Sequence, residues 1–312
     1  MKLLAALAFV ALVAPVLAPY DAGRQFAGYP FAPPMRPHLL DDGRPRMPFA
    51  YPIRLVDPIE RRYEEDRTRR VTSYEGDAPW FLLGSDALGR DVLSRALIGT
   101  RLSLGIALLA TLLTLVIGAA VGAIAASAGG WVETLLMRVA DLVIVLPGIY
   151  VVLALRGTLP LVLTTGQVFG ALTLVLALVG WPTVARGVRG ILAVERTTEY
   201  AEAARASGAG PWRVIVRHLL PAARGFLGAQ ATILVPAFVM AEATLSFVGL
   251  GFAPPTPSWG AMLYEAGAVR IAADAPWLLA PAGLVFLTVL AVHTAAHTEE
   301  PFRAADFTSK SF

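Results

Sequence analysis

Long apolar runs that hold almost no charge constrain this chain more than any other feature. A helix needs about 20 mostly apolar residues to cross the hydrocarbon core of a bilayer. Six runs approach or reach that length: Leu3–Pro19, Ser103–Ala126, Thr134–Leu155, Leu159–Trp181, Gly225–Phe247 and Pro276–His297. Charged residues make up only 16% of the 312 residues, whereas soluble domains carry roughly a quarter. The sequence therefore predicts an all-α polytopic membrane protein with about six transmembrane helices.

The first apolar run has two interpretations. MKLLAALAFVALVAPVLAPY has one lysine, Lys2, followed by a short apolar core with small residues near its end, which is typical of a cleavable signal peptide as well as of a first transmembrane helix. We favour a retained helix over residues 1–19, because with six spans each later short loop lies on the side of the membrane that its arginine content predicts. Residues 20–98 then form a long extracytoplasmic segment, 99–297 a membrane core of five helices, and 298–312 a cytoplasmic tail.

The distribution of arginine indicates which loops face the cytoplasm. The connection from Arg186 to Arg224 holds seven arginines and three glutamates, and short loops rich in arginine remain cytoplasmic. The tail falls on the same side, whereas Gly249–Ala275 falls outside. Both termini are therefore predicted to be cytoplasmic. The net charge of +3 reflects this topology, so we expect no nucleic-acid partner.

The segment 20–98 begins with proline-rich irregular sequence and continues into the charged run IERRYEEDRTRR. We interpret that run as a solvated surface element or a short charged helix rather than a binding patch. Within the spans, glycines recur at the spacing that lets helix backbones approach closely. These are Gly118 and Gly122, Gly166 and Gly170, and Gly225 and Gly228.

Few ionisable side chains fall inside the spans. Arg138 and Asp141, three residues apart, are expected to form a local structural pair. Glu242 falls near the outer edge of the fifth span, where a pathway-lining and a structural role remain equally open. His293 and His297 are four apart, as metal ligands on one helix face can be, but no third ligand converges on them, so we expect no metal site.

No catalytic pattern is present in the sequence. The chain has no cysteine, and its lysines are Lys2 and Lys310 alone, which excludes a phosphate-binding loop ending in Lys-Ser or Lys-Thr. A membrane-anchored enzyme with its chemistry in residues 20–98 is disfavoured, since that region offers one histidine, His38, and no recognisable pair of catalytic groups.

The arginine-rich loop carries the clearest functional signal. Residues Thr198–Ala206 are predicted to form a helix with Thr197 or Thr198 as its cap and acids in its first turns, and Trp212–Leu219 a second short helix. Two short helices with small alanines and a glycine turn between them suit a groove in a partner protein. The alternative is an amphipathic connector that rests on lipid headgroups.

This loop resembles the EAA loop of ABC importer permeases, by which such subunits dock on their cytoplasmic ATPases. The residues that carry the resemblance are Glu202, Ala203, Ala204, Gly208, Leu220 and Pro221. The general pattern has isoleucine where this chain has His218, a departure that resembles the peptide-transport branch of the family.

Two further segments resemble permeases of the dipeptide/oligopeptide/nickel branch. The stretch GSDALGRDVLSR before the second span is similar to a family signature, through Gly84, Asp86, Gly89, Arg90, Asp91 and Arg95. Physically, we expect Asp86 to cap a short helix and the two arginines to anchor it in headgroups. Leu245–Gly251 and Pro254–Gly260 are similar to the outer loop of the family.

The resemblance implies a permease subunit in the cell (inner) membrane that forms the translocation pathway of an importer for peptides or similar small solutes. It implies four kinds of partner: a second permease subunit, two cytoplasmic ATPase subunits, an extracytoplasmic solute-binding protein and membrane lipid. ATP and magnesium would bind to the ATPases, and no cofactor to this chain. The alternative is a secondary transporter driven by an ion gradient, with Glu242 as its proton site.

Overall fold

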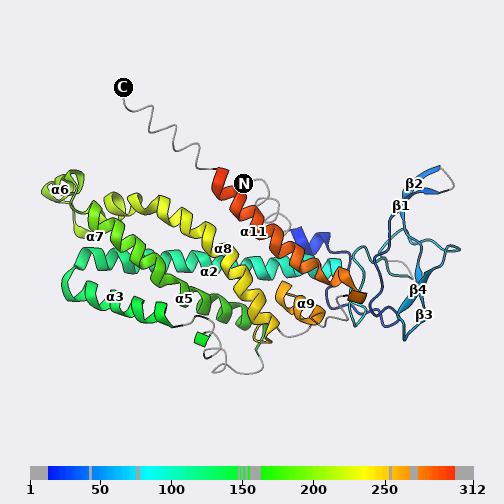
Figure 1. Ribbon diagram of the computed structural model, residues 1–312. Helices are drawn as coiled ribbons and strands as arrows, with labels where there is room; N and C mark the ends of the chain where they lie inside the picture. Colours follow the sequence, from blue (N-terminus) through cyan, green and yellow to red (C-terminus); the bar gives the residue numbers. More distant parts are fainter. Residues whose placement is uncertain are drawn as a thin grey trace. The chain divides into compact units, whose positions relative to one another are not determined.

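The computed structural model (Figure 1) describes residues 13–41, 44–74, 78–146, 163–252, 255–267 and 273–298, together with 148, 150, 151 and 154. The chain divides into two compact units. Unit 1 comprises residues 1–105 and 242–291, and unit 2 comprises residues 106–241 and 292–312. The long helices α2 (Val92–Ala128) and α8 (Arg224–Phe247) each contribute residues to both units.

Four predicted spans correspond to helices long and apolar enough to cross a membrane. They are α2, α5 (Thr165–Glu195), α8 with the short helices that lead into it, and α11 (Ala280–Thr298) with the 3₁₀ turn Pro276–Leu279 before it. The third predicted span begins as α3 (Gly130–Val145), and much of its remainder lies outside the described residues. Of the first, only 13–17 are described as helix. The count of six spans and the sides of the loops stay predictions.

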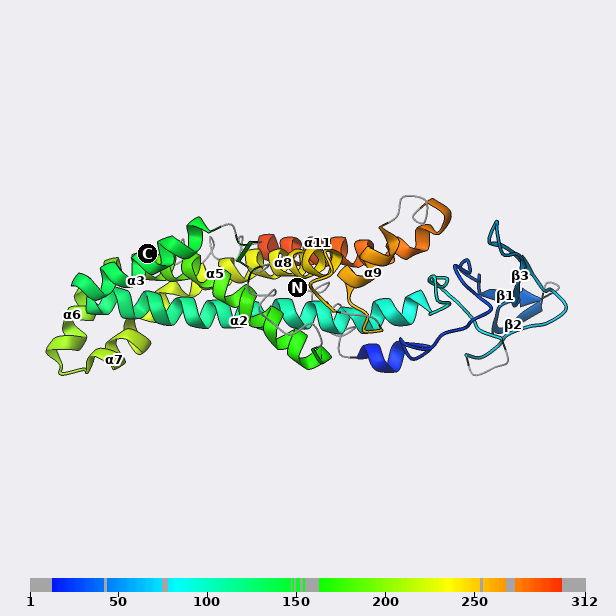
Figure 2. The same cartoon turned by 90° about the horizontal axis from the view of Figure 1, so that it is seen from below.

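Unit 1 contains two β-hairpins that the sequence did not predict (blue strands in Figures 1 and 2). β1 (His38–Asp41) pairs antiparallel with β2 (Arg44–Phe49), and β3 (Ile53–Asp57) with β4 (Arg62–Glu65). The expectation of a charged helix is wrong, because β4 lies inside that run and pairs with β3. The expectation of a solvated surface holds, since the charged residues of β4 are exposed.

A small aromatic core holds this segment together. Its buried side chains are each at most 7% exposed: Ala32, Met35, Ala50, Ile53, Val71, Trp80 and Phe81. The Tyr63 hydroxyl of β4 donates to the carbonyl of Pro30 at 2.7 Å. Burial raises the pKa of Tyr63 to about 12, so this tyrosine remains a donor at physiological pH. The segment therefore has a packed core of its own, although it is proline-rich.

In unit 2, glycines bring α2 and α5 into close contact. A Cβ added at Gly118 would lie 2.5 Å from the Cβ of Val184, and one at Gly122 would lie 2.5 Å from the carbonyl oxygen of Ala185. The predicted close approach is thus confirmed for Gly118 and Gly122. A Cβ at Gly166, Gly170 or Gly228 meets no described atom within 4 Å, so no close approach is seen at these three glycines within the described part of the chain.

Candidate functional site

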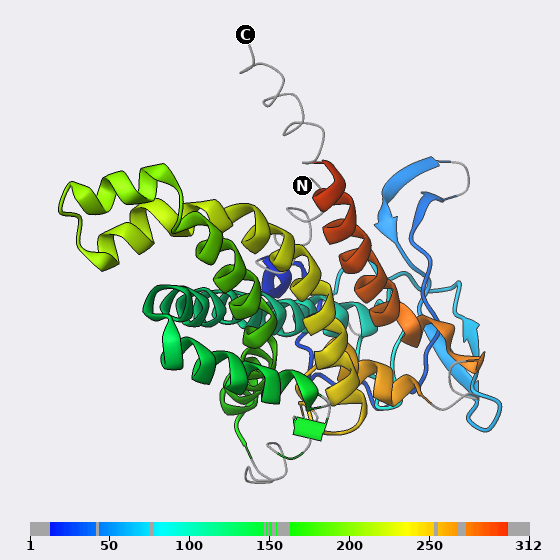
Figure 3. The ribbon, with the colours of Figure 1, turned by 60° about the vertical axis from the view of Figure 1, so that its left-hand side comes forward.

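The arginine-rich connection between α5 and α8 contains two short helices, α6 (Glu199–Ala206) and α7 (Pro211–Val214). From α7 the chain continues through a π-helical turn and a 3₁₀ turn, Ile215–Ala223, into α8. Figure 3 shows α6 and α7 as a yellow-green pair. The predicted helix at Thr198–Ala206 is confirmed. Thr198 stands at its N-cap position, but its hydroxyl donates to the carbonyl of Glu195 at 2.6 Å instead of capping α6.

Gly208 ends α6 in a conformation that glycine adopts at little cost. Its φ is +81°, in the left-handed region. The Gly208 amide donates to the carbonyl of Arg205 at 2.9 Å, and the Ala209 amide to that of Ala204 at 3.1 Å. These are the two bonds of a Schellman motif. A Cβ at position 208 would meet no atom of the described residues within 4 Å, so the backbone conformation favours glycine although the space outside it is open.

One face of α6 is buried and the other is exposed. Ala201 has no exposed surface and packs in a core cluster that includes Val214, while Ala204 lies partly buried against the same cluster. Glu202 and Ala203 are exposed. The alanines therefore have two different roles. Ala201 and Ala204 pack α6 against its own loop, whereas Ala203 adds only a methyl group to the exposed face beside Glu202.

The last residues of the EAA pattern lie where the loop rejoins the long helices. Leu220 is partly buried against the cluster that holds Ala201, and Pro221 stands at the start of the 3₁₀ turn. Ala223, two residues later, has no exposed surface. Leu220 and Pro221 thus help to position the loop through its internal packing and its turn, and not through its exposed face.

A cleft of about 570 Å³ opens beside Glu202. Its walls include Arg196, which donates to the carbonyl of Ala126 at 2.6 Å, and Arg205, which donates to the carbonyl of Arg196 at 2.8 Å. These bonds join the C-terminal end of α5 to that of α2 and to α6. Glu202 and Arg205 both line this cleft, so it presents a negative and a positive side chain.

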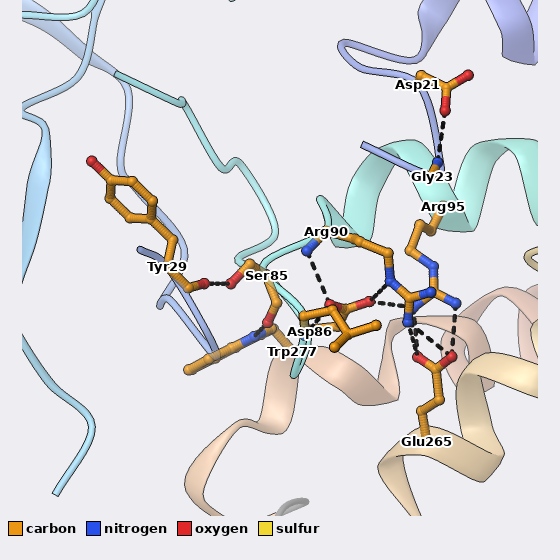
Figure 4. Close-up of polar contacts among 10 residues, drawn as sticks. Asp21, Gly23, Tyr29, Ser85, Asp86, Arg90, Arg95, Glu265 and Trp277 are labelled. Carbon is orange, nitrogen blue, oxygen red and sulfur yellow. Dashed lines mark hydrogen bonds and ion pairs between the residues drawn. The ribbon is translucent and has the colours of Figure 1, made fainter. Parts of the chain in front are cut away.

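The second sequence signature forms a buried ion network in unit 1 (Figure 4). Asp86 accepts from the Arg90 Nε at 2.6 Å and also from Arg95. Glu265, on α9 (Trp259–Ala266), accepts from Arg90 at 3.0 and 3.1 Å and from Arg95 at 2.5 and 2.9 Å. Asp86, Arg90 and Arg95 are at most 3% exposed. Two carboxylates thus hold two guanidinium groups out of water, and this joins α9 to the start of α2.

Two expectations about this signature are wrong. Arg90 and Arg95 do not anchor in lipid headgroups, because both side chains are buried in ion pairs with Asp86 and Glu265. Asp86 caps no helix, because it accepts instead from the amides of a turn, Leu88 at 2.8 Å and Arg90 at 3.0 Å.

Asp91 takes the capping position of α2. One of its oxygens accepts from the Ser94 amide at 2.7 Å and from the Ser94 hydroxyl at 2.6 Å, while the other has no partner in the described part of the chain. Burial raises the pKa of Asp91 to about 6 against these bonds. The Ser94 hydroxyl in turn accepts from the Tyr20 amide at 3.0 Å. Asp91 therefore fixes both the helix start and the N-terminal segment.

The signature glycines lie where backbones cross. A Cβ at Gly84, φ +73°, would meet the carbonyl oxygen of Ala32 at 2.7 Å, and one at Gly89, φ +71°, that of Phe26 at 2.1 Å. Both positions combine a left-handed backbone with close approach, so they exclude other residues. Every residue of the signature thus has a structural reason within unit 1.

Glu242 has no exposed surface and joins three elements. Its carboxylate accepts from the Ser103 hydroxyl of α2 at 2.7 Å and from the Ser246 hydroxyl of α8 at 2.7 Å. The Ser103 oxygen also accepts from the amide of Trp259, at the start of α9, at 3.2 Å. Packing therefore explains Glu242 in this conformation without a role in lining a pathway.

Arg138 and Asp141 do not form the expected local pair. Asp141 pairs instead with Arg186 of α5 at 3.2 Å. At the end of α11 the side chain of His297 lies outside the described residues, and no group of three metal-ligating side chains occurs among those that are described.

Sequence reasoning missed Glu265, Ser103 and Tyr20. Glu265 lies 170 residues from Arg95, and nothing local marks it as a partner. The one signal for a missing acidic partner was that Arg90 and Arg95 lie close together in a short signature that apolar sequence follows.

The apolar helices are those of a polytopic membrane protein, in which the ion network of unit 1 is buried and one face of α6 is exposed. A family profile described as "Binding-protein-dependent transport system inner membrane component" matches residues 118–298. The glutathione transport system permease protein GsiD of Pectobacterium atrosepticum is 36% identical over 217 residues, covering 70% of each chain. The dipeptide transport system permease protein DppC of Bacillus subtilis is 36% identical, covering 68% of this chain and 64% of that protein.

A solved structure of the MetNI methionine ABC transporter in an inward-facing conformation matches with a TM-score of 0.50 and 23% identity, over 65% of this chain and 95% of that one. This likeness shows the fold. The chain belongs to the binding-protein-dependent transport system inner membrane components.

The chain is accordingly a multi-pass inner-membrane permease subunit of an ATP-driven importer, and its partners include an ATPase and a binding protein. ATP hydrolysis lies with partner subunits. The alternative of an ion-driven secondary transporter with Glu242 as proton site is wrong, because family membership assigns the energy source to the ATPase.

Proposed function

We propose that this chain pairs with a second permease subunit and two ATPase subunits, and that it imports small peptides delivered by an extracytoplasmic binding protein. The relatives named for glutathione and dipeptide transport support this substrate class. ATP and magnesium bind on the ATPase subunits in this proposal, and no cofactor binds to this chain.

The exposed face of α6 carries the proposal. Glu202 and Ala203 lie on the exposed face of α6, whose other face is packed. The Schellman turn at Gly208 fixes the direction in which the chain leaves α6. Such a short, rigid helix with a smooth outer face suits a groove on the ATPase. Glu202 contacts the ATPase, and Ala203 and Gly208 keep the helix narrow enough to dock.

The mechanism follows from linkage. ATP closes the ATPase subunits, and α6 moves with them. The membrane helices then shift between outward-facing and inward-facing packings, because ATP binding on the ATPase and the translocation pathway are linked to the same two conformations. Arg196 donates to the C-terminal end of α2, and Arg205 of α6 donates to the C-terminal end of α5, so these hydrogen bonds connect the loop to the helix bundle.

The arginine-rich loop also sets the proposed orientation. With this loop in the cytoplasm, both termini are cytoplasmic, and residues 20–98 and Pro254–Gly260 face the binding protein.

Two substitutions at Gly208 test the docking assignment. Gly208→Val adds bulk and forces a left-handed backbone on a β-branched residue, so we expect uptake and coupled ATPase activity to be lost while membrane insertion stays intact. Gly208→Asn is the matched control, because asparagine tolerates this conformation, and we expect it to keep most of the stability of α6. Unchanged uptake by the valine variant would contradict docking through α6.

A further inference from the structure

A charged cleft lies between α3 and α5 in unit 2. Figures 1 and 3 show these two helices side by side. Its volume is about 610 Å³. Three arginines and two acids line it, so its net charge is +1: Arg138, Arg186, Arg189, Glu133 and Asp141. The docking function described above makes no use of this cleft.

Two ion pairs satisfy most of these charges. The Arg189 Nε donates to Glu133 at 2.5 Å, and Arg186 pairs with Asp141 at 3.2 Å. Arg138 has no hydrogen bond or ion pair within the described part of the chain, and it is exposed at the cleft. The excess positive charge therefore belongs to Arg138, and the ligand that complements it is an anion.

The surroundings of Arg138 are apolar. Leu135 and Leu142, 53% and 68% exposed, stand three residues before and four after it, so all three share one face of α3. Trp131, 75% exposed, precedes them on the same face, and tryptophan is typical of the membrane interface. A ligand at this place meets a cationic cleft and an apolar surface together.

We propose that this cleft binds the phosphate headgroup of an anionic phospholipid at Arg138, with an acyl chain along Leu135 and Leu142. In the orientation proposed above, the start of α3 faces the cytoplasm. Side chains of an α-helix tilt toward its N-terminus, so Arg138 reaches back to the headgroups of the inner leaflet.

Native mass spectrometry of the complete complex tests this site. Phosphatidylglycerol and phosphatidylcholine with identical acyl chains are added, and the lipid-bound fraction is counted for wild type, Arg138→Gln and Arg213→Gln. Arg213 is the matched control, an exposed arginine of α7 outside the cleft. We expect Arg138→Gln to weaken retention of phosphatidylglycerol about fivefold, as one basic residue at an anionic surface does, and to leave phosphatidylcholine unchanged.

Three outcomes overturn the proposal. Equal retention of phosphatidylglycerol by wild type and Arg138→Gln removes the site. Displacement of the lipid by glycerol phosphate at equal concentration assigns the cleft to a free phosphate ester instead. If subunit assembly depends on Arg138 while lipid retention does not, the occupant is the neighbouring subunit. Because lipid retention is measured without transport, failure here leaves the docking function of α6 standing.

Discussion

The two family signatures of this chain differ in where their polar groups find partners. In unit 1, the charges of Asp86, Arg90 and Arg95 are neutralised within the chain, together with Glu265, in a network that is almost closed to solvent. In the connection between α5 and α8, Glu202 is exposed beside an open cleft. The first signature builds the subunit, and the second keeps an exposed face, which we propose docks on the ATPase.

This difference shows that a recognisable motif is not by itself a binding site. Both stretches combine acids, arginines and glycines, yet burial separates them. At Gly89 the carbonyl oxygen of Phe26 lies 2.1 Å from the Cβ position, whereas Gly208 has a φ of +81° and no described atom within 4 Å of its Cβ position. Substitutions should therefore affect stability in unit 1 and coupling in the loop.

The strongest test of the contrast is Arg95→Ala. Removing one guanidinium leaves Asp86 and Glu265 short of a partner in a buried site, which typically costs about 3–5 kcal/mol. We expect most of the folded protein to be lost, measured as yield and as the midpoint of thermal unfolding in detergent. Arg101→Ala, at an exposed position of the same helix, should change neither. Normal stability of the Arg95 variant would show that the network is not structural.

A second test uses the pH dependence of Asp91. Its pKa of about 6 in the folded chain exceeds the value near 3.9 of an unfolded aspartate, so the folded state binds the proton more tightly between these limits. The contribution of Asp91 to stability therefore rises as pH falls from 7 to 4 and is lost as pH rises through 6.

Relative to Asp91→Asn, wild type should gain about 2 kcal/mol between pH 7 and pH 4.5. Thermal unfolding midpoints of the two proteins at pH 7 and pH 4.5 measure the change. Parallel pH profiles would mean that Asp91 does not titrate in this interval.

A smaller effect is expected at the junction held by Ser103. Its hydroxyl serves both Glu242 and the amide of Trp259, so Ser103→Ala leaves buried polar groups unpaired at a cost of about 1–3 kcal/mol. Ser127→Ala is the control on the same helix, since that hydroxyl donates only to the carbonyl of Ala123 in its own helix. Equal unfolding midpoints for the two variants would argue against a structural role for Glu242.

Local signals explain what the sequence could predict. The bounds of α6 follow from the Thr198 position, the acids of the first turn and Gly208, all within a few residues of one another. The spans of α2, α5, α8 and α11 follow from hydropathy. No partner distant in sequence is needed for either.

What could not be predicted depends on distant pairing. The strand β4 exists because Tyr63 and its neighbours pair with β3 across a turn, which outweighs the helical composition of the charged run. Asp141 meets Arg186 rather than the nearer Arg138 because α3 packs on α5. Glu265 completes the signature from α9 across 170 residues.

The most direct test of the central claim is Ala203→Trp, which fills the exposed face of α6 without touching its packed side. We expect the free energy of unfolding to stay within about 0.5 kcal/mol of wild type, as for other exposed substitutions, while the ATPase subunits no longer copurify with the chain. Retained copurification and uptake together with a lower unfolding midpoint would show instead that this face of α6 serves the fold of the subunit.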